Sequence, residues 1–351
     1  MRFAFLPTGV LLLASGLLPN MAQALPPKRS LSIPEGPRYS YLYSEARPSK
    51  PTFLLLHGFP STANEWRKQF VDLSAAGYGV VVPDLLGFGD TDKPVEVEAY
   101  AFSNISSHVT KILDHEGLQN VIGVGHDWGS VLLGRVYNYY PQYFSALAFL
   151  SVPYTPPAPF DLDAINEQTK QAFGYETFGY MYFFNETDAA ATISLHPESF
   201  FSLIYPENSE IQKTELCPRG KIAEWLRDDR RTPLPSYESQ SDRDARLQQF
   251  ASGGWVGPTN WYKSAVRNID SDAVAQIPLE NYAIAKPVVF AGGDIDFVTR
   301  PELMAMIAGQ AKQEGWLPNV EFKSVQGGSH WLILEQPQQV LAILEDLAAK
   351  L

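Results

Sequence analysis

The chain has few cysteines and few basic residues. Its 351 residues include a single cysteine, Cys217, which excludes an internal disulfide framework. Lys and Arg number 27 against 39 Asp and Glu, the net charge is −12, and no basic run, internal repeat or low-complexity tract occurs. Because phosphate binding needs a basic patch, the charge argues against a nucleic-acid-binding function. The sequence also has no cluster of metal ligands and no dinucleotide-binding fingerprint, so we expect neither a metal nor an organic cofactor.

Apolar residues, in contrast, are plentiful. They make up 45% of the chain, and aromatic residues make up 13%. This composition provides a sizeable core for one large or two modest domains and gives no sign of disorder. It favours a soluble globular protein that binds a small, mostly apolar ligand.

The first residues have the order of a secretory signal. Arg2 is followed by the apolar stretch "LPTGVLLLASGLLP" and then by "AQA", which ends at Ala24. We expect residues 1–24 to be a signal peptide cleaved near Ala24, so the protein is predicted to be secreted or to enter the secretory pathway. A membrane anchor is the alternative, although prolines and glycines interrupt the apolar run, which falls short of the ~20 residues that a span needs.

Two further features relate to the secretory pathway. Lys28 and Arg29 form either a dibasic processing point or an ordinary basic surface pair. Asn104 and Asn185 each begin a glycosylation sequon, which has meaning only in a eukaryotic secretory pathway. The sequence leaves both questions open.

Strands and helices are predicted to alternate along much of the chain. A helix is predicted over 100–116, ended by Gly117, because Ile105, Val109, Ile112 and Leu113 mark one helical face. Alternating elements imply a mostly parallel sheet with helices on both faces. The predicted strands are 38–45, 52–57, 78–83, 120–125, 145–151, 288–293 and 319–325, and further helices are predicted to end near residue 139 and to cover 301–314 and 337–350.

The alternation is interrupted once. A proline-rich stretch, "VPYTPPAPF" at 152–160, precedes a segment rich in aromatics and helix-like patterns, and the strand–helix pattern resumes only after Pro287. We therefore predict an α/β core formed by residues 30–151 and 281–351. Residues 152–280 are predicted to form an inserted, mainly helical cap.

The stretch "VIGVGHDWGS" (121–130) predicts a strand, a sharp turn at Asp127 and a helix. Gly125 and Gly129 permit the close backbone contacts of such a turn. At this position a side chain projects above the sheet edge beside the N–H groups of the helix start, which suits a nucleophile. The alternative is an ordinary helix N-cap, which needs no catalytic partners.

Partners for a nucleophile follow in the chain. His330 lies in a glycine-containing loop after the last predicted strand, and either Asp294 or Asp296 follows the preceding strand. The order nucleophile, acid, histidine is that of the α/β-hydrolase triad. The backbone N–H groups of Phe59, in "LLLHGFP", and of Trp128 are predicted to form a two-donor oxyanion hole.

From about residue 35 to its C-terminus, the chain resembles the soluble epoxide hydrolases among the α/β-hydrolases. Each motif alone is a moderate signal, but together, in this order, they are specific. The matching motifs are "HGFP" (57–60), "PDLLGFGDTDKP" (83–94), "GHDWGS" (125–130), "NWY" (260–262), "DFV" (296–298) and "GGSHW" (327–331).

The resemblance implies conversion of an epoxide to a vicinal diol through an ester on Asp127, which water activated by His330 then hydrolyses. It also implies two cap tyrosines that assist the leaving oxygen. Tyr262, in "GPTNWYKS", is one, and Tyr180, in "FGYMYFFNET", is the other, although Tyr175 and Tyr182 are close by.

The same resemblance favours Asp296 as the acid, because it matches the family's pattern of glycine, two residues and aspartate, and Asp294 is the reserve. Phe59, Trp66 and Trp331 are predicted to line the substrate pocket. Asp84 and Asp90 are expected to fix loops.

Two alternatives remain. A haloalkane dehalogenase would use the same Asp127, but those enzymes commonly carry asparagine where this chain has Phe59, and halide release leaves paired tyrosines unexplained. A non-catalytic binding protein on the same fold is the second. The predicted partners are a small apolar epoxide and water, with no nucleic acid, and the sequence leaves a homo-oligomer open.

Overall fold

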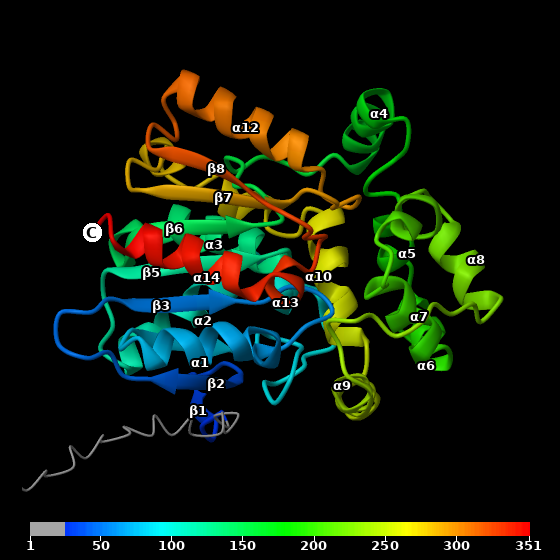
Figure 1. Cartoon of the computed structure of the whole chain (residues 1–351), viewed down its shortest axis with the longest axis horizontal. Helices are drawn as coiled ribbons and strands as arrows, with labels where there is room; N and C mark the ends of the chain where they lie inside the picture. The colour runs from blue at the N-terminus through cyan, green and yellow to red at the C-terminus, as the bar shows by residue number, and fades with distance from the viewer. Residues whose placement is uncertain (1–24) are drawn as a thin grey trace, which may run out of the picture.

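The computed structural model describes residues 25–351, and the predicted signal peptide lies outside this range. Eight strands form one sheet in the order β1-β2-β4-β3-β5-β6-β7-β8 (Figure 1). Strands β3 to β8 run parallel, and two antiparallel pairings, β2 with β4 and β1 with β2, extend the sheet on one side. The strands are β1 (Arg29–Ser32), β2 (Arg38–Ser44), β3 (Thr52–Leu56), β4 (Gly79–Pro83), β5 (Val121–His126), β6 (Phe144–Leu150), β7 (Val288–Gly293) and β8 (Val320–Val325).

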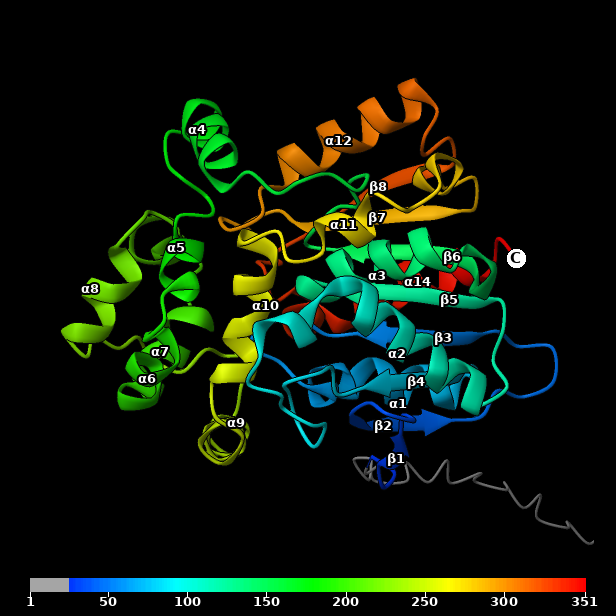
Figure 2. The ribbon, with the colours of Figure 1, turned by 180° about the vertical axis from the view of Figure 1, so that it is seen from behind.

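Helices cover both faces of the sheet. Figure 1 shows α1 (Arg67–Ala75), α13 (Leu332–Glu335) and α14 (Pro337–Ala348) in front of it, and Figure 2 shows α2 (Phe102–His115) and α3 (Trp128–Tyr139) on the other face. Helix α12 (Pro301–Glu314) packs against β7 and β8. The predicted parallel sheet between two helical layers is therefore confirmed. Within residues 25–351, no helix is long and apolar enough to cross a membrane.

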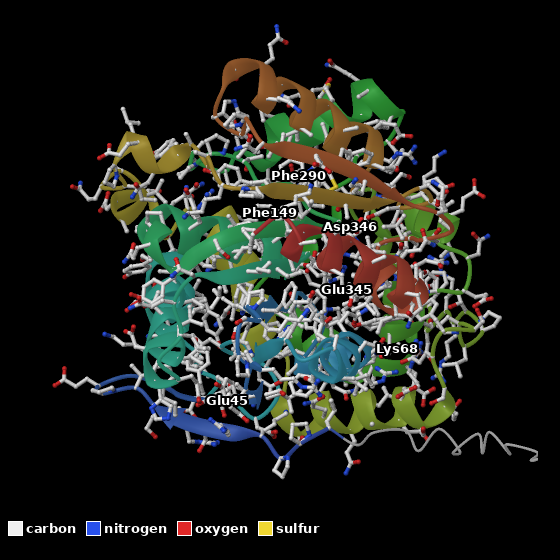
Figure 3. All side chains as sticks on the ribbon, turned by 60° about the vertical axis from the view of Figure 1, so that its left-hand side comes forward. Glu45, Lys68, Phe149, Phe290, Glu345 and Asp346 are labelled. Carbon is white, nitrogen blue, oxygen red and sulfur yellow. The ribbon has the colours of Figure 1, made fainter. Side chains whose placement is uncertain are left out.

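The apolar pattern of the sequence corresponds to buried positions. Every residue of β3, β4 and β5 is buried, as expected for strands covered on both faces. The predicted apolar face of α2 is buried as well, and Gly117 follows the helix with a φ of 65°. Phe149 on β6 and Phe290 on β7 are register partners whose rings meet edge to face at 5.7 Å inside the core (Figure 3).

The sequence patterns missed β1 and α1. β1 has four residues that are mostly exposed, so it carries no apolar alternation. The ion pairs of Lys28 with Asp84 (2.6 Å) and Asp90 (2.9 Å), and of Arg29 with Glu116 (2.5 Å), connect this edge to the core. The two basic residues thus belong to the folded edge, and Asp84 and Asp90 bind loop and edge groups.

The segment between β6 and β7 is helical and lies at the carboxyl ends of the parallel strands (Figures 1 and 2). The loops that follow β3, β5, β7 and β8 therefore face the inserted helices. These are α4 (Leu162–Phe173), α5 (Tyr180–Asn185), α6 (Ala189–Leu195), α7 (Pro197–Ile204), α8 (Lys221–Arg227), α9 (Gln240–Gly253), α10 (Val256–Val266) and α11 (Ser271–Val274).

Candidate active site

Asp127 occupies a strained turn between β5 and α3. Its φ of 54° and ψ of −125° lie where residues with a Cβ are rarely found, and such strain concentrates at functional sites. The turn is tightly enclosed, since a Cβ at Gly129 would overlap the carbonyl oxygen of Leu56 and one at Gly58 would overlap the Asp127 carboxylate. The Asp127 side chain makes no capping hydrogen bond to α3, which contradicts the N-cap interpretation.

The Asp127 carboxylate is held between two groups from other loops. Its Oδ1 accepts a hydrogen bond of 2.8 Å from the Phe59 N–H, and its Oδ2 lies 3.4 Å from Nε2 of His330. On the other side of the imidazole, Nδ1 of His330 lies 3.2 Å from Oδ2 of Asp296. The three side chains are buried and form a continuous chain of polar contacts.

The two candidate acids have different surroundings. The second oxygen of Asp296 accepts the N–H groups of Val298 (2.8 Å) and Thr299 (2.9 Å), which fixes its carboxylate toward the imidazole. Asp294 is exposed, and its Oδ1 accepts the Gly327 N–H at 2.8 Å. The structure therefore brings Asp296, and not the reserve Asp294, to the histidine.

Two residues that the sequence analysis did not single out hold the histidine loop. The backbone oxygen of His330 accepts hydrogen bonds from Nε2 of His126 (2.7 Å) and from Oγ of Ser151 (3.0 Å). His126 is the last residue of β5, directly before Asp127, and Ser151 directly follows β6. Their position at the strand ends was the available signal, but neither residue type in that place indicates such a role.

The charges at the site stabilise one another. Burial alone lowers the pKa of His330, but the carboxylates of Asp296 and Asp127 outweigh it and raise this pKa well above its usual value. Burial alone raises the pKa of Asp127, but the hydrogen bond and charge of His330 outweigh it and lower this pKa. The raised pKa of His330 and the lowered pKa of Asp127 both favour an imidazolium between two carboxylates.

Tyr180 and Tyr262 face the same region from the cap. Tyr180 begins α5, Tyr262 lies on α10, and their ring centroids are 6.0 Å apart. Burial, followed by charged and phenolic neighbours that include Asp127, raises the pKa of both phenols, so both remain protonated donors. The neighbouring tyrosines are engaged elsewhere, since Tyr175 donates to the Phe297 carbonyl oxygen at 2.6 Å and Tyr182 donates to Asp163.

Two cavities meet at Asp127 and Tyr180. The larger has a volume of about 770 Å³ and extends between α3, the proline-rich segment and α4. The smaller has a volume of about 20 Å³ and is also lined by Phe59, Tyr262 and His330. This volume is enough for one water molecule, which needs roughly 10–15 Å³.

The predicted pocket residues divide between cavity and core. Phe59 and Trp331 line the smaller cavity. Trp66 lines neither cavity, so that prediction is wrong: it is the last residue of η1 (Ala63–Trp66), and its side chain is fully buried in the core, where aromatic bulk serves packing. The backbone N–H of Trp128 donates no hydrogen bond to another residue of 25–351, as expected at the first position of a helix. Its part in an oxyanion hole stays a prediction.

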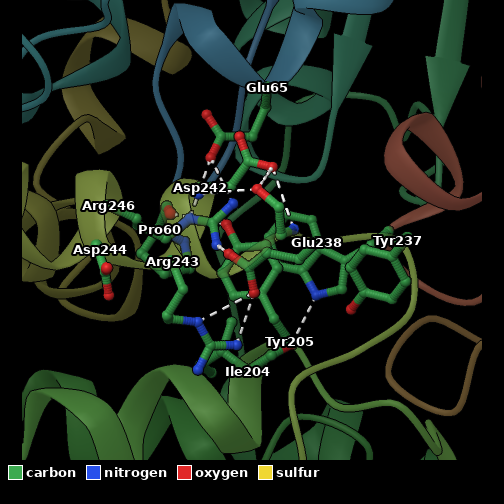
Figure 4. Close-up of polar contacts among 12 residues, drawn as sticks. Pro60, Glu65, Ile204, Tyr205, Tyr237, Glu238, Asp242, Arg243, Asp244 and Arg246 are labelled. Atoms are coloured by element: carbon green, nitrogen blue, oxygen red, sulfur yellow. Dashed lines mark hydrogen bonds and ion pairs between the residues drawn. The ribbon is translucent and has the colours of Figure 1, made fainter.

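A buried ionic cluster connects the cap to the loop that carries Phe59. Figure 4 shows Arg246 of α9 between Glu65 of η1, at 3.2 Å, and Glu238, which also binds Arg243 at 2.7 Å. Glu65 in turn accepts the Thr62 N–H at 2.8 Å. The cap thus contacts the Phe59 loop through charged hydrogen bonds.

Aromatic contacts extend this connection to the histidine loop. Tyr205 donates to the Pro60 carbonyl oxygen at 2.9 Å, lies under the Arg246 guanidinium at 3.9 Å and stacks on Trp331 with centroids 4.0 Å apart. Trp331 donates its indole N–H to the Ile204 carbonyl oxygen at 2.6 Å. The loops on either side of Asp127 are therefore both attached to the cap.

Comparison with known proteins gives one consistent result. The family described as alpha/beta hydrolase fold matches residues 51–337. The chain is 30% identical over 308 residues to epoxide hydrolase 3 of Siraitia grosvenorii, covering 86% of this chain and 92% of that protein. It is 28% identical over 298 residues to bifunctional epoxide hydrolase 2 of Mus musculus, covering 84% of this chain and 51% of that protein, so it spans about half the length of this relative. The solved structure of an epoxide hydrolase from an endophytic Streptomyces superposes with a TM-score of 0.77 at 27% identity, covering 92% of this chain and 95% of that chain.

Proposed function

The chain belongs to the α/β-hydrolase family, among the epoxide hydrolases, and we propose that it converts an epoxide to a vicinal diol. The observation that carries the proposal is the position of Asp127. Its carboxylate lies between the Phe59 N–H and the His330–Asp296 pair, in cavities that Tyr180 also lines. A carboxylate at this place is suited to attack on saturated carbon, because it needs no prior loss of a proton.

In the first step, a carboxylate oxygen of Asp127 displaces the epoxide oxygen from one ring carbon. A new carbon–oxygen ester bond forms as the ring carbon–oxygen bond breaks. Tyr180 and Tyr262 donate hydrogen bonds to the departing oxygen, and one of them transfers its proton to it. The product is a hydroxyalkyl ester of Asp127 and one tyrosinate.

The ester changes the state of His330. Esterification removes the negative charge of Asp127, and with it one of the two carboxylates that hold the pKa of His330 high. The imidazolium then returns a proton to the tyrosinate and becomes neutral. The first step therefore converts His330 from an ion-pair partner into a general base, oriented by Asp296.

In the second step, His330 takes a proton from a water molecule, which attacks the carboxyl carbon of Asp127. The small cavity beside Asp127 and His330 has room for this water. The Phe59 N–H, 2.8 Å from Oδ1, stabilises the negative oxygen of the tetrahedral intermediate. Collapse releases the diol and restores the Asp127 carboxylate and the imidazolium.

A haloalkane dehalogenase is the alternative chemistry at the same nucleophile. The side chain at position 59 argues against it, because the Phe59 ring packs at 4.9 Å against Tyr262 and offers no donor to a halide. The test is turnover of a panel of epoxides and haloalkanes, with diol and halide measured separately. We expect diol formation without halide release, and halide release without diol formation would contradict the proposal.

We also propose that residues 1–24 are a cleaved secretory signal, supported by the order of Arg2, the apolar run and "AQA". Cleavage then leaves Leu25 at the N-terminus. Further processing after Arg29 would remove Lys28 and its ion pair with Asp84, so we expect it not to occur in the folded protein. N-terminal sequencing of secreted protein tests this, and an intact Met1 in membrane fractions would support an anchor instead.

A further inference from the structure

One face of α3 forms a wall of the larger cavity. Trp128, Val131 and Arg135 lie on this face at helical spacing, and all of them line the cavity. Arg135 follows Asp127 by eight residues, which corresponds to about 12 Å along the helix axis. A single cavity therefore contains the proposed nucleophile and, two turns away, a cationic side chain.

The guanidinium of Arg135 has only neutral partners. Its Nη1 donates to Oδ1 of Asn138 at 3.1 Å and to the Thr155 carbonyl oxygen at 3.4 Å. No carboxylate among residues 25–351 forms an ion pair with it. Burial lowers the pKa of Arg135, but a guanidinium keeps its charge in proteins, so a partly buried cation faces a largely apolar cavity.

Besides Asp127, the acidic residue that lines the same cavity is Asp270, but its oxygens are already occupied. Both accept hydrogen bonds from Ser103, from its N–H at 3.1 Å and from its hydroxyl group, and one also accepts the Tyr139 hydroxyl at 3.4 Å. Asp270 therefore attracts Arg135 only at a distance. Within residues 25–351, the other N–H groups of the Arg135 guanidinium donate no hydrogen bond.

The position of Arg135 along the cavity suits the charged end of a ligand. Its partner Thr155 is exposed, and so is Met306, with 60% of its surface accessible, on another wall of the cavity. The cavity wall is thus exposed beside Arg135, at Thr155, whereas Asp127 and Tyr180 are buried. An amphipathic molecule entering this way would keep its charged group near water and place its apolar part against the nucleophile.

We propose that Arg135 is the binding site for a carboxylate on the substrate, and that it selects epoxides in which an apolar chain separates the oxirane from that carboxylate by a length on the order of two helical turns. A planar carboxylate matches the guanidinium fork, which donates two parallel hydrogen bonds. This specificity role rests on the proposed function at Asp127. It assigns no catalytic step to Arg135.

The test compares the epoxide of oleic acid with its methyl ester, which keeps the chain and the oxirane but lacks the charge. We measure kcat and KM for both with the wild type and with Arg135→Gln. Arg135→Gln loses a charge-assisted hydrogen bond to the acid, which is expected to lower the acid-to-ester ratio of kcat/KM by roughly ten- to a hundredfold. The change should come from a higher KM for the acid, with kcat little affected. Arg135→Lys should retain part of the preference, and Arg227→Gln, which removes an exposed arginine of α8, should leave the ratio unchanged.

If Arg135→Gln changes the acid and the ester equally, the assignment is wrong, although epoxide hydrolysis itself stands. If the wild type hydrolyses neither compound, binding of oleate, which has no oxirane, is measured by calorimetry below its micellar concentration. Weaker binding to Arg135→Gln than to the wild type and Arg227→Gln would then support the carboxylate site without the proposed reaction. Equal binding to all three proteins would overturn it.

Discussion

Replacement of Arg246 tests how firmly the cap holds the Phe59 loop. Arg246 binds Glu65 and Glu238, and the exposed side-chain fractions of the three residues are 7%, 5% and 2%. Arg246→Met keeps most of the apolar volume but leaves two buried carboxylates without this partner, although Glu238 keeps Arg243. Removal of one partner from a buried ion pair destabilises by about 3–5 kcal/mol, and we expect a loss in this range.

The same substitution should slow catalysis. Glu65 holds the Thr62 N–H, in the loop that also carries the Phe59 donor to Asp127. A displacement of this donor weakens the stabilisation of the tetrahedral intermediate, and small misplacements of catalytic groups lower rates by up to ~100-fold. We expect the loss in the rate of ester hydrolysis, with a smaller effect on ester formation. Urea unfolding and single-turnover kinetics measure the two effects separately.

The matched control is Arg231→Met in the same cap. Arg231 pairs with Glu198, but these side chains are 51% and 53% exposed. Exposed pairs contribute about 0–1 kcal/mol, so this variant should lose little stability and no activity. If Arg246→Met and Arg231→Met lost the same stability and kept the same rate of ester hydrolysis, the reasoning about the buried cluster would be refuted.

Other predictions concern the residues around Asp127. Tyr180→Phe or Tyr262→Phe should slow ester formation by roughly ten- to a thousandfold. The double variant should be nearly inactive toward epoxides while it remains folded. Rapid-mixing kinetics measures the rate of ester formation, and a double variant that kept the parent rate would refute this prediction. Asp127→Asn, which mimics the uncharged ester, should lower the pKa of His330, as followed by NMR, and an unchanged pKa would contradict the proposed switch to a base. Because folding raises the pKa of His330, protonation of this residue stabilises the folded protein. This contribution is fully present below the unfolded pKa of ~6.5 and is lost as the pH rises through the raised pKa. Denaturation from neutral to alkaline pH should therefore show a loss of stability in the wild type that is absent from His330→Gln.

Most strands and helices of the core, and the order of the three catalytic candidates along the chain, could be predicted from local patterns. The continuous apolar runs of β3, β4 and β5 reflect strands that are buried on both faces, and the glycines around Asp127 reflect backbone contact at its turn. The chain order of Asp127, an acid at 294 or 296, and His330 was enough to predict a triad, and the resemblance to the epoxide hydrolases favoured Asp296, which lies 3.2 Å from His330.

The failures have physical causes as well. Strand β1 is short and exposed and is held by ion pairs that join distant segments, so its sequence carries no strand pattern. Trp66 is aromatic near a loop of the site, but the direction of its side chain depends on tertiary packing. Arg135 and Arg246 resemble ordinary surface arginines in the sequence, and only the fold shows that one faces a cavity and the other two buried carboxylates.

The most direct test of the central proposal is the mass of the protein during turnover. In His330→Gln the water cannot be activated, so the ester on Asp127 should accumulate after mixing with an epoxide. Mass spectrometry of the intact protein should then show an increase equal to the mass of the epoxide, and peptide mapping should place it on Asp127. Asp127→Ala should show no increase. A His330→Gln protein whose mass stays unchanged while diol still forms would contradict the covalent mechanism.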